Sequence, residues 1–166
     1  MTTYPIHGPW PGDLVIIPRP RGGDWLEDEA KSLRNEGFDI VVSLLTAEEV
    51  EELELTREAE LIREQGLQYC NYSIPDLGVP ASRESARNLL EKMRLELLAG
   101  KKIAVHCRGS IGRAGLVVSS ILVLAGMSPS QAIRQVSEAR RFQSPETTEQ
   151  REWVTNLLAE PASSRA

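Results

Sequence analysis

The amino-acid sequence predicts a single α/β domain, in which helices cover both faces of a mostly parallel central sheet of four to five strands. Short apolar segments rich in β-branched residues alternate with longer helical patterns along the chain. The chain has 166 residues, 41% of them hydrophobic, which is enough for one domain with an ordinary core. We expect the domain to span residues 1–159, and we expect the Ala-, Ser- and Pro-rich residues 160–166 to form a disordered tail.

The strands are predicted at four short apolar segments. Three of these segments are mostly apolar, which is typical of parallel strands whose two faces both lie against helices. The predicted strands cover residues 13–17, 38–45, 67–74 and 102–106.

The helices are expected to begin at residues whose side-chain oxygen accepts a hydrogen bond from a free backbone amide. The pairs that fit such a capping box are Asp24 with Glu27, Thr46 with Glu49, and Ser128 with Gln131, and Ser144 before Pro145 is a similar start. Glycines that close a helix follow the patterns at Gly37, Gly66, Gly100 and Gly126. The predicted helices cover residues 25–36, 47–65 with a break near Glu54, 83–99, 112–125, 129–141 and 145–159.

Composition excludes several classes of function. Nineteen Lys and Arg against twenty-four Asp and Glu give a net charge of −5, which argues against nucleic acid as the main partner. The longest apolar stretch, from Gly115 to Gly126, is well short of the ~20 residues that span a bilayer, so we expect no membrane span. Residues 1–10 lack the basic start and apolar run of a secretory signal. We therefore expect a cytoplasmic protein, and we expect a monomer.

The two cysteines, Cys70 and Cys107, are too few for a disulfide framework or a four-cysteine zinc site. In a reducing compartment both are free thiols. Cys70 alternates with Tyr72 and Ile74 on one face of a predicted strand, so the simplest interpretation is a small core residue. A disulfide between Cys70 and Cys107 stays open as an alternative.

The most informative stretch joins the last predicted strand to the helix at 112–125. It reads His-Cys-Arg-Gly-Ser-Ile-Gly-Arg-Ala-Gly from residue 106. Such a loop binds anions, because backbone N–H groups and the positive end of the helix converge there, and its glycines let the backbone curl. Cys107 lies among these donors, which favour a thiolate, and Arg113 can offer two parallel N–H donors to a phosphate. The sequence therefore predicts an anion-binding loop with a reactive thiol.

A proton donor is expected on a separate loop, because a thiolate that attacks phosphorus has to expel an alkoxide or phenoxide. The candidate is Asp76, which follows the predicted strand 67–74 in the turn-rich sequence Pro-Asp-Leu-Gly. Parallel neighbouring strands would bring Asp76 and Cys107 to the same edge of the sheet. Asp76 could then protonate the leaving oxygen and afterwards deprotonate the attacking water. An ordinary turn aspartate is the alternative interpretation.

These motifs resemble those of the cysteine-dependent protein tyrosine phosphatase superfamily: His-Cys, five residues and Arg, preceded by a Pro-Asp loop. The compact size resembles the dual-specificity branch, and the pattern from Gly12 to Leu158 is similar to its kinase-associated-phosphatase-like members. The resemblance implies the protein tyrosine phosphatase-like fold and a phosphorylated protein or another phosphate ester as substrate. It implies no metal and no other cofactor.

The resemblance also assigns roles to individual residues. Cys107 would be the nucleophile, Arg113 the phosphate clamp, and Asp76 the general acid and base. His106 would tune Cys107 by buried hydrogen bonding, with a plain core histidine as the alternative. The loop would bind phosphate through the amides of Arg108, Gly109, Ser110, Ile111 and Gly112.

Three positions are less regular. Gln150 matches the second glutamine of a family loop that orients water, whereas Glu146 stands where the first is often glutamine. Ala114 occupies a position where related loops have Ser or Thr, whose hydroxyl stabilises the departing thiolate. The resemblance therefore leaves open how fast a phospho-cysteine would be hydrolysed.

Two functions from different classes fit the sequence. The first is a phosphomonoesterase that forms a phospho-cysteine and acts on phosphotyrosine, phosphothreonine or phosphoserine in proteins, with phosphoinositides or small phosphate esters as the alternative. The second is a slow or inactive module that binds phosphorylated partners through the same loop, a hypothesis motivated by Ala114.

Overall fold

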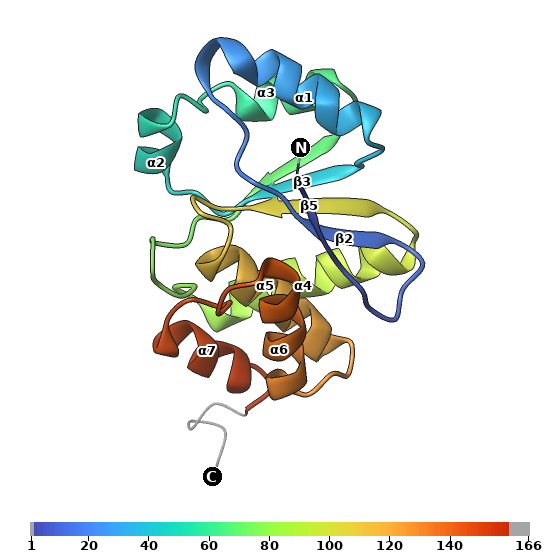
Figure 1. Ribbon diagram of the computed structural model, residues 1–166, viewed down its shortest axis with the longest axis vertical. Coiled ribbons are helices and arrows are strands. Elements are labelled where there is room, and N and C mark those ends of the chain that lie inside the picture. Colours follow the sequence, from blue (N-terminus) through green and yellow to red (C-terminus); the bar gives the residue numbers. More distant parts are fainter. Residues whose placement is uncertain (1, 160–166) are drawn as a thin grey trace.

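The computed structural model describes residues 2–159 and shows a five-stranded sheet between two layers of helices (Figure 1). The order across the sheet is β1-β2-β5-β3-β4. Strands β2, β5, β3 and β4 are parallel, and β1 is antiparallel to β2. The strands are β1 Tyr4–Ile6, β2 Asp13–Ile16, β3 Ile40–Ser43, β4 Gln68–Asn71 and β5 Lys102–His106. The predicted fold class is confirmed, and the predicted tail at 160–166 lies outside the described residues.

Strand β1 is the element that the sequence did not predict. Its central residue is Pro5, which has no N–H to donate and argues against a strand. The structure places β1 at the edge of the sheet, where a proline is tolerated because only one side of the strand is paired.

The helices form two layers, one on each face of the sheet (Figure 1). The layer above the sheet in Figure 1 consists of the 3-10 turn Gly23–Trp25, α1 Leu26–Asn35, α2 Ala47–Glu52 and α3 Glu58–Glu64. The layer below it consists of α4 Arg83–Leu98, α5 Gly112–Leu124, α6 Pro129–Arg140 and α7 Thr148–Thr155. No helix within residues 2–159 has the length and apolar character to cross a membrane.

Each layer packs on its own hydrophobic core. Ile40 and Val42 of β3 contribute to the core shared with the lower layer, whereas Val41 between them contributes to the core of the upper layer. This division follows from the alternation of side chains along a strand. Helix α5 is buried along nearly its whole length, as its apolar sequence predicts.

Several predicted helix boundaries are confirmed. Thr46 and Glu49 form the capping box of α2, and the Ser128 hydroxyl accepts a hydrogen bond from the Gln131 amide at the start of α6. The break near Glu54 separates α2 from α3, and Glu54 has a positive φ of 57°. The glycines that follow α1, α3, α4 and α5 have the positive φ that ends a helix, namely Gly37, Gly66, Gly100 and Gly126.

Two predicted helix starts are wrong. Asp24 lies in the 3-10 turn before α1 and makes no side-chain cap hydrogen bond. Helix α7 begins at Thr148 and not at Pro145, because the capping box is formed by Thr147 and Gln150. Ser144 is used elsewhere, since its hydroxyl donates to a carbonyl group of the β5–α5 loop.

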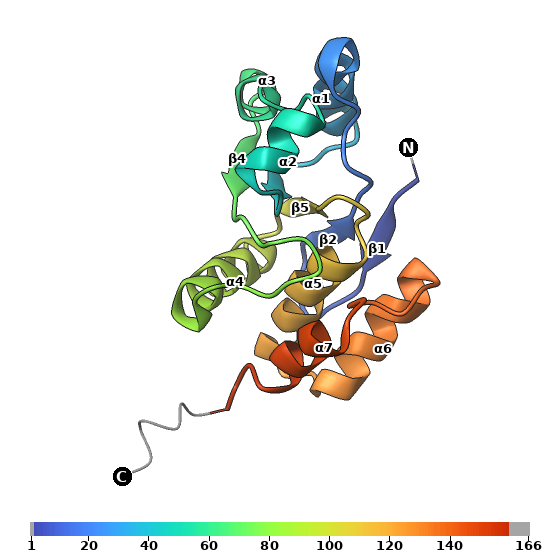
Figure 2. The same ribbon diagram turned by 90° about the vertical axis from the view of Figure 1, so that its left-hand side faces the viewer.

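The carboxyl ends of the four parallel strands meet at one edge of the sheet, which faces the viewer in Figure 2. Four connections leave from this edge: the segment from β2 into the 3-10 turn before α1, the turn from β3 into α2, the segment from β4 into α4, and the loop from β5 into α5. Of the predicted site residues, His106 ends β5, Asp76 lies after β4, residues 107–111 lie on the loop after β5, Gly112 and Arg113 begin α5, and Gln150 lies in α7.

Candidate active site

The loop of residues 107–112, here called the cysteine loop, has four successive carbonyl groups held by side chains outside it. Arg19 Nη1 donates to the carbonyl oxygen of residue 108 at 2.8 Å. Arg140 donates through Nη2 to the carbonyl oxygen of residue 109 at 3.4 Å and through Nε to the carbonyl oxygen of residue 110 at 2.8 Å. The Ser144 hydroxyl donates to residue 111 at 2.6 Å. The four carbonyl groups therefore turn outward, toward the segments that surround the loop.

The orientation of the carbonyl groups fixes the orientation of the amides. In a planar trans peptide the C=O of one residue and the N–H of the next point in opposite directions. When the carbonyl groups of residues 108–111 turn outward, the N–H groups of residues 109–112 turn inward. Within residues 2–159, the amides of residues 108–111 donate to no protein acceptor. The cysteine loop therefore presents convergent backbone donors, as the sequence predicts.

Two further contacts shape this loop. The Ser110 hydroxyl donates to the Ile17 carbonyl at 2.6 Å and accepts from the Cys107 amide at 3.4 Å, which ties the loop to the end of β2. A side chain at residue 112 would crowd its neighbours, because a Cβ atom there would lie 3.0 Å from side-chain oxygens of Glu146 and Gln150, which would have to shift. Glycine at residue 112 therefore allows the start of α5 to approach the segment before α7.

Arg113 is buried and bound by the carboxylate of Glu49, for which the sequence predicts only a role in capping a helix. Its Nη1 and Nη2 atoms donate to the two carboxylate oxygens of Glu49 at 2.6 and 2.8 Å. Nη1 also donates to the Ile74 carbonyl at 2.9 Å. The hydrogen bonds from Arg113 lower the pKa of Glu49 from 4.5 to about 2, although burial acts in the opposite direction. The guanidinium plane is thus fixed before any ligand binds.

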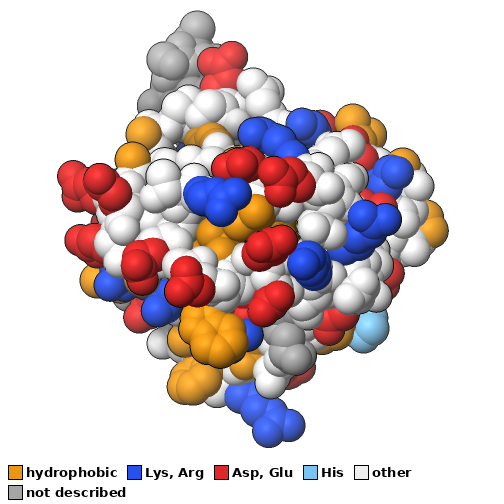
Figure 3. All heavy atoms as spheres, turned by 90° about the horizontal axis from the view of Figure 1, so that it is seen from above, with side chains coloured by type: hydrophobic (Ala, Val, Ile, Leu, Met, Phe, Trp, Pro, Cys, Tyr) orange, Lys and Arg blue, Asp and Glu red, His pale blue; other side chains and the backbone are white. Residues whose placement is uncertain are grey.

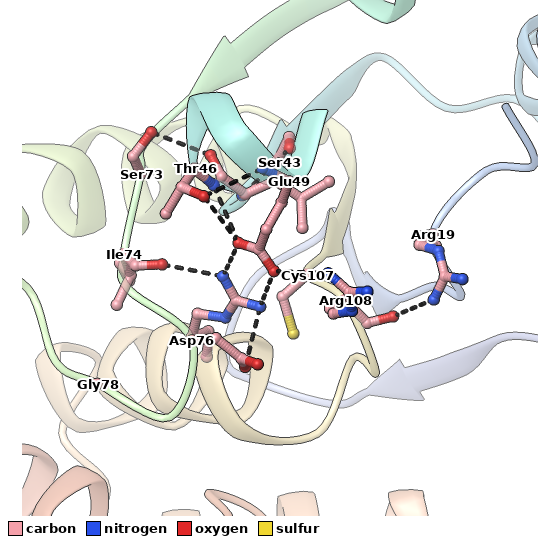
Figure 4. Close-up of polar contacts among 12 residues, drawn as sticks. Arg19, Ser43, Thr46, Glu49, Ser73, Ile74, Asp76, Gly78, Cys107 and Arg108 are labelled. Carbon is pink, nitrogen blue, oxygen red and sulfur yellow. Dashed lines mark hydrogen bonds and ion pairs between the residues drawn. The ribbon is translucent and has the colours of Figure 1, made fainter. Parts of the chain in front are cut away.

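Asp76 is brought to Arg113 by the segment that follows β4. One carboxylate oxygen of Asp76 accepts from Arg113 Nη2 at 3.1 Å, and the Asp76 side chain is 58% exposed. Figure 4 shows the Cys107 side chain between Asp76 on one side and Arg108 on the other. A cavity of about 260 Å³ lies here, lined by Asp76, Leu77, Cys107, Arg108, Gly109, Ile111, Gly112, Arg113 and Glu146. The predicted nucleophile, clamp and proton donor therefore share one cavity.

His106 lies beneath the cysteine loop in a buried chain of hydrogen bonds. Its Nε2 atom is 2.7 Å from a carboxylate oxygen of Glu58, and both side chains are fully buried. The Tyr69 hydroxyl donates to the other oxygen of Glu58 at 3.3 Å. Burial and the charge of Glu58 raise the pKa of Tyr69. His106 is thus a hydrogen-bonded histidine, as expected, and Glu58 is a partner that the sequence did not reveal.

Gln150 lies close to the site, but its amide group has structural partners at both ends. Its oxygen accepts from the Thr147 amide at 3.1 Å, and its nitrogen donates to the Gly78 carbonyl at 3.0 Å. Gln150 therefore connects the start of α7 to the segment that carries Asp76. A role in orienting water stays a prediction.

Cys70 and Ala114, which the sequence also singles out, do not line the cavity that contains Cys107. Cys70 is half-buried on β4, and burial raises the pKa of its thiol. Both Cys70 and Cys107 are free thiols. Ala114 is fully buried in α5. In the part of the chain that the structure describes, no cluster of three or more His, Cys, Asp and Glu could hold a metal ion.

Solved structures define the class of this fold. The chain superposes on kinase associated phosphatase with a TM-score of 0.83, covering 95% of this chain and 98% of that one, at 21% sequence identity. It superposes on the active form of Tk-PTP with a TM-score of 0.74, covering 88% of this chain and 91% of that one, at 28% identity. The fold is that of the protein tyrosine phosphatases.

Sequence comparisons identify the family within this class. Residues 17–127 match the family described as "Polymorphic toxin system, DSP-PTPase phosphatase", so the chain belongs to this dual-specificity phosphatase family. A protein of Invertebrate iridescent virus 3 named "Putative tyrosine phosphatase 067L" is 33% identical in an alignment of 129 residues that covers 72% of this chain and 54% of the viral protein. Cyclin-dependent kinase inhibitor 3 of Rattus norvegicus is 26% identical over 117 residues, which are 69% of this chain and 55% of the rat protein. The chain spans about half the length of these curated relatives.

Proposed function

We propose that this protein hydrolyses phosphate monoesters through a phospho-cysteine on Cys107. The observation that carries the proposal is the outward orientation of the four carbonyl groups of residues 108–111, which leaves the inward amides and Arg113 around one thiol. Donors fixed in this way can stabilise the charge of a phosphate in the transition state without reorganising. Membership in the dual-specificity phosphatase family supports the same conclusion.

The first chemical step transfers the phosphoryl group to sulfur. The amides of residues 108–112 and Arg113 bind the phosphate oxygens, and the Cys107 thiolate attacks phosphorus. The bond from phosphorus to the ester oxygen breaks, and Asp76 in its acid form gives its proton to that oxygen. A phosphate oxygen that takes the place of Asp76 on Arg113 Nη2 frees the Asp76 carboxyl group for this transfer.

The second step releases the phosphate. The Asp76 carboxylate takes a proton from a water molecule, whose oxygen attacks phosphorus as the sulfur–phosphorus bond breaks. Inorganic phosphate leaves, and Cys107 is again a thiolate. Ala114 offers no hydroxyl to this thiolate, and the Ser110 hydroxyl already donates to the Ile17 carbonyl.

We propose phosphotyrosine, phosphothreonine and phosphoserine residues of proteins as the substrates, because the family match is to dual-specificity phosphatases. Cys107 needs a reduced thiol, so we propose that the protein acts in the cytoplasm or in another reducing compartment.

Replacement of the nucleophile tests the proposal. Cys107→Ser should abolish phosphate release from an aryl phosphate and from phosphopeptides and still bind them, because the donors of the cysteine loop remain. Cys70→Ser is the matched control and should keep wild-type turnover. Phosphate release and calorimetric binding measure both. Turnover by Cys107→Ser near the wild-type rate would exclude a phospho-cysteine, and a wild-type protein that binds but releases no phosphate would be a binding module.

Replacement of the proton donor tests the role of Asp76. For Asp76→Ala we expect a loss of kcat on the order of 10²–10⁴, the usual contribution of a positioned acid or base. The loss of kcat should be larger with an alkyl phosphate than with an activated aryl phosphate, because a good leaving group departs without a proton. Equal losses for both esters would show that Asp76 is structural.

A further inference from the structure

A second cavity adjoins the site across the cysteine loop. Its volume is about 520 Å³, and it shares Arg108 and Gly109 with the cavity that contains Cys107. Its other walls come from the segment after β2 and from the end of α2. The lining residues are Pro18, Arg19, Pro20, Arg21, Gly22, Trp25, Leu53, Arg108 and Gly109. The second cavity therefore lies within reach of a group attached to the same substrate molecule.

The lining of this cavity is basic, although the chain as a whole carries a net charge of −5. Three arginines and no acidic residue line it. Acidic and basic side chains are interspersed on the face of the molecule seen from above (Figure 3). Basic side chains therefore line the cavity beside the site that we propose for a phosphate ester, although Arg21 is paired with Glu29 and Arg108 with Glu52.

The three guanidinium groups are held in place and keep free donors. Arg19 donates a hydrogen bond through Nη1 to the carbonyl group of residue 108. Arg108 donates through Nη1 to the Glu52 carboxylate at 3.2 Å. Arg21 donates a hydrogen bond through Nε to the Glu29 carboxylate, and its guanidinium group lies 4.4 Å from the centre of the Trp25 ring. Within residues 2–159, each group thus has one nitrogen bound to the protein and the rest of its five N–H donors available. Such an arrangement suits an anion with several oxygens.

We propose that the second cavity binds a second anionic group, a phosphate or a carboxylate, on a residue that flanks the phosphorylated residue of a protein substrate. The apolar walls favour a peptide over a sugar phosphate, because Pro18, Pro20, Trp25 and Leu53 can pack against aliphatic parts of a peptide chain. The inference rests on the proposed function and specifies its substrate: an acidic or doubly phosphorylated segment.

The test compares two phosphotyrosine peptides that differ in one flanking residue, which is threonine in one and phosphothreonine in the other. Binding to the Cys107→Ser protein is measured by calorimetry, so no turnover is needed. We expect the doubly phosphorylated peptide to bind on the order of 10-fold more tightly, as for one charge-assisted hydrogen bond, and this gain to fall as salt is raised.

Arg21 is the residue to change, because it contacts the second cavity and not the cavity of Cys107. Arg21→Met in the Cys107→Ser background should remove most of the gain, and Arg21→Glu should reverse it. Arg34→Glu on α1 is the matched control, since Arg34 is exposed and lines neither cavity. In the protein with Cys107 intact, Arg21→Met should leave turnover of p-nitrophenyl phosphate, which has no second anion, unchanged.

The outcomes separate this inference from the proposed function. Equal affinity for the two peptides, or a gain that survives Arg21→Glu, overturns the second site whatever the activity. Failure of both peptides to bind contradicts the proposed function and the inference with it. If Arg21 increases the affinity for a water-soluble inositol bisphosphate more than it increases the affinity for the peptide, the assignment to a protein substrate is overturned.

Discussion

The upper and lower helix layers both support the cysteine loop, but they do so by different chemistry. From the upper layer, Glu49 of α2 and Glu58 of α3 bind the ionisable side chains Arg113 and His106. From the lower layer, Arg140 of α6 and Ser144 bind backbone carbonyl groups of the loop. The upper layer thus holds side-chain charge in place, whereas the lower layer fixes the shape of the backbone.

The difference separates two requirements of the anion-binding site that we propose, a counter-charge for its arginine and a fixed orientation of its backbone amides. Arg113 has little access to solvent and needs a counter-charge nearby, because an unpaired buried charge is costly. The amides of the loop need only the correct orientation, which outward hydrogen bonds to the carbonyl groups provide. Substitutions in the upper layer should therefore have large effects that depend on pH, and substitutions in the lower layer should have small effects that do not.

The largest effect is expected from Glu49→Gln. The amide keeps the size of the side chain but removes the carboxylate that bonds both terminal nitrogens of Arg113, and the more exposed Asp76 is then its remaining acidic partner. Loss of one partner of a buried hydrogen-bonded charge pair costs about 2–5 kcal/mol, so kcat/KM should fall on the order of 10²–10³. Steady-state kinetics with an aryl phosphate measures this loss. Glu48→Gln, an exposed neighbour on α2, is the control and should be neutral; near-wild-type activity of Glu49→Gln would show that Arg113 is positioned by its other contacts.

The next effect concerns stability at acid pH. Arg113 lowers the pKa of Glu49 from 4.5 to about 2. Because the pKa is lower in the folded state, the ion pair contributes full stability above pH 4.5 and loses it as the pH falls toward 2. This lowering of the Glu49 pKa corresponds to a stabilisation of no more than about 3–4 kcal/mol in the free energy of unfolding.

Urea unfolding of the wild type and Glu49→Gln at several pH values measures this contribution. The difference in the free energy of unfolding should be largest at neutral pH and should shrink between pH 4.5 and 2. A difference that stays constant over this range would mean that the charge of Glu49 contributes nothing and that its loss acts through packing.

The smallest effect is expected from Ser144→Ala in the lower layer. The change removes the side-chain donor to the Ile111 carbonyl, and an unsatisfied buried group costs roughly 1–3 kcal/mol, although the Gly115 amide still donates to this oxygen and lowers the cost. We expect a decrease of about 1 kcal/mol in the free energy of unfolding, independent of pH, and less than a tenfold change in kcat/KM. Ser130→Ala, at an exposed position of α6, provides the comparison. A strong pH dependence in Ser144→Ala would contradict the distinction between the two layers.

The sequence revealed the parts of the site that are local in the chain. Cys107 and Arg113 lie within one loop and the first residues of one helix, and Asp76 lies five residues after the end of β4, so strand direction alone places the segments that carry them at one edge. Most of the sheet was predictable for a similar reason, because the buried parallel strands β2, β3 and β5 are rich in apolar β-branched residues. The exception is β1, where Pro5 concealed an edge strand.

The supporting residues could not be found in this way, because their partners are distant in the sequence. Glu49 fits a capping box, and the structure confirms that role, but the same carboxylate also holds Arg113 across 64 residues. The sequence predicts a helix start at Ser144, but in the structure its hydroxyl donates a hydrogen bond to the carbonyl oxygen of residue 111. A polar residue that already has a local partner gives no sign in the sequence of a second one.

The outward hydrogen bonds of the cysteine loop also determine when the site can form during folding. Its carbonyl groups are held by Arg19, from the beginning of the chain, and by Arg140 and Ser144, from near its end. Translation proceeds from the N-terminus, so β5 and the loop emerge well before two of these three donors. We expect a nascent chain that ends after α5 to have the sheet but not the anion-binding loop. The site is thus completed last, and binding of phosphate reports that the whole domain, not only its sheet, has folded.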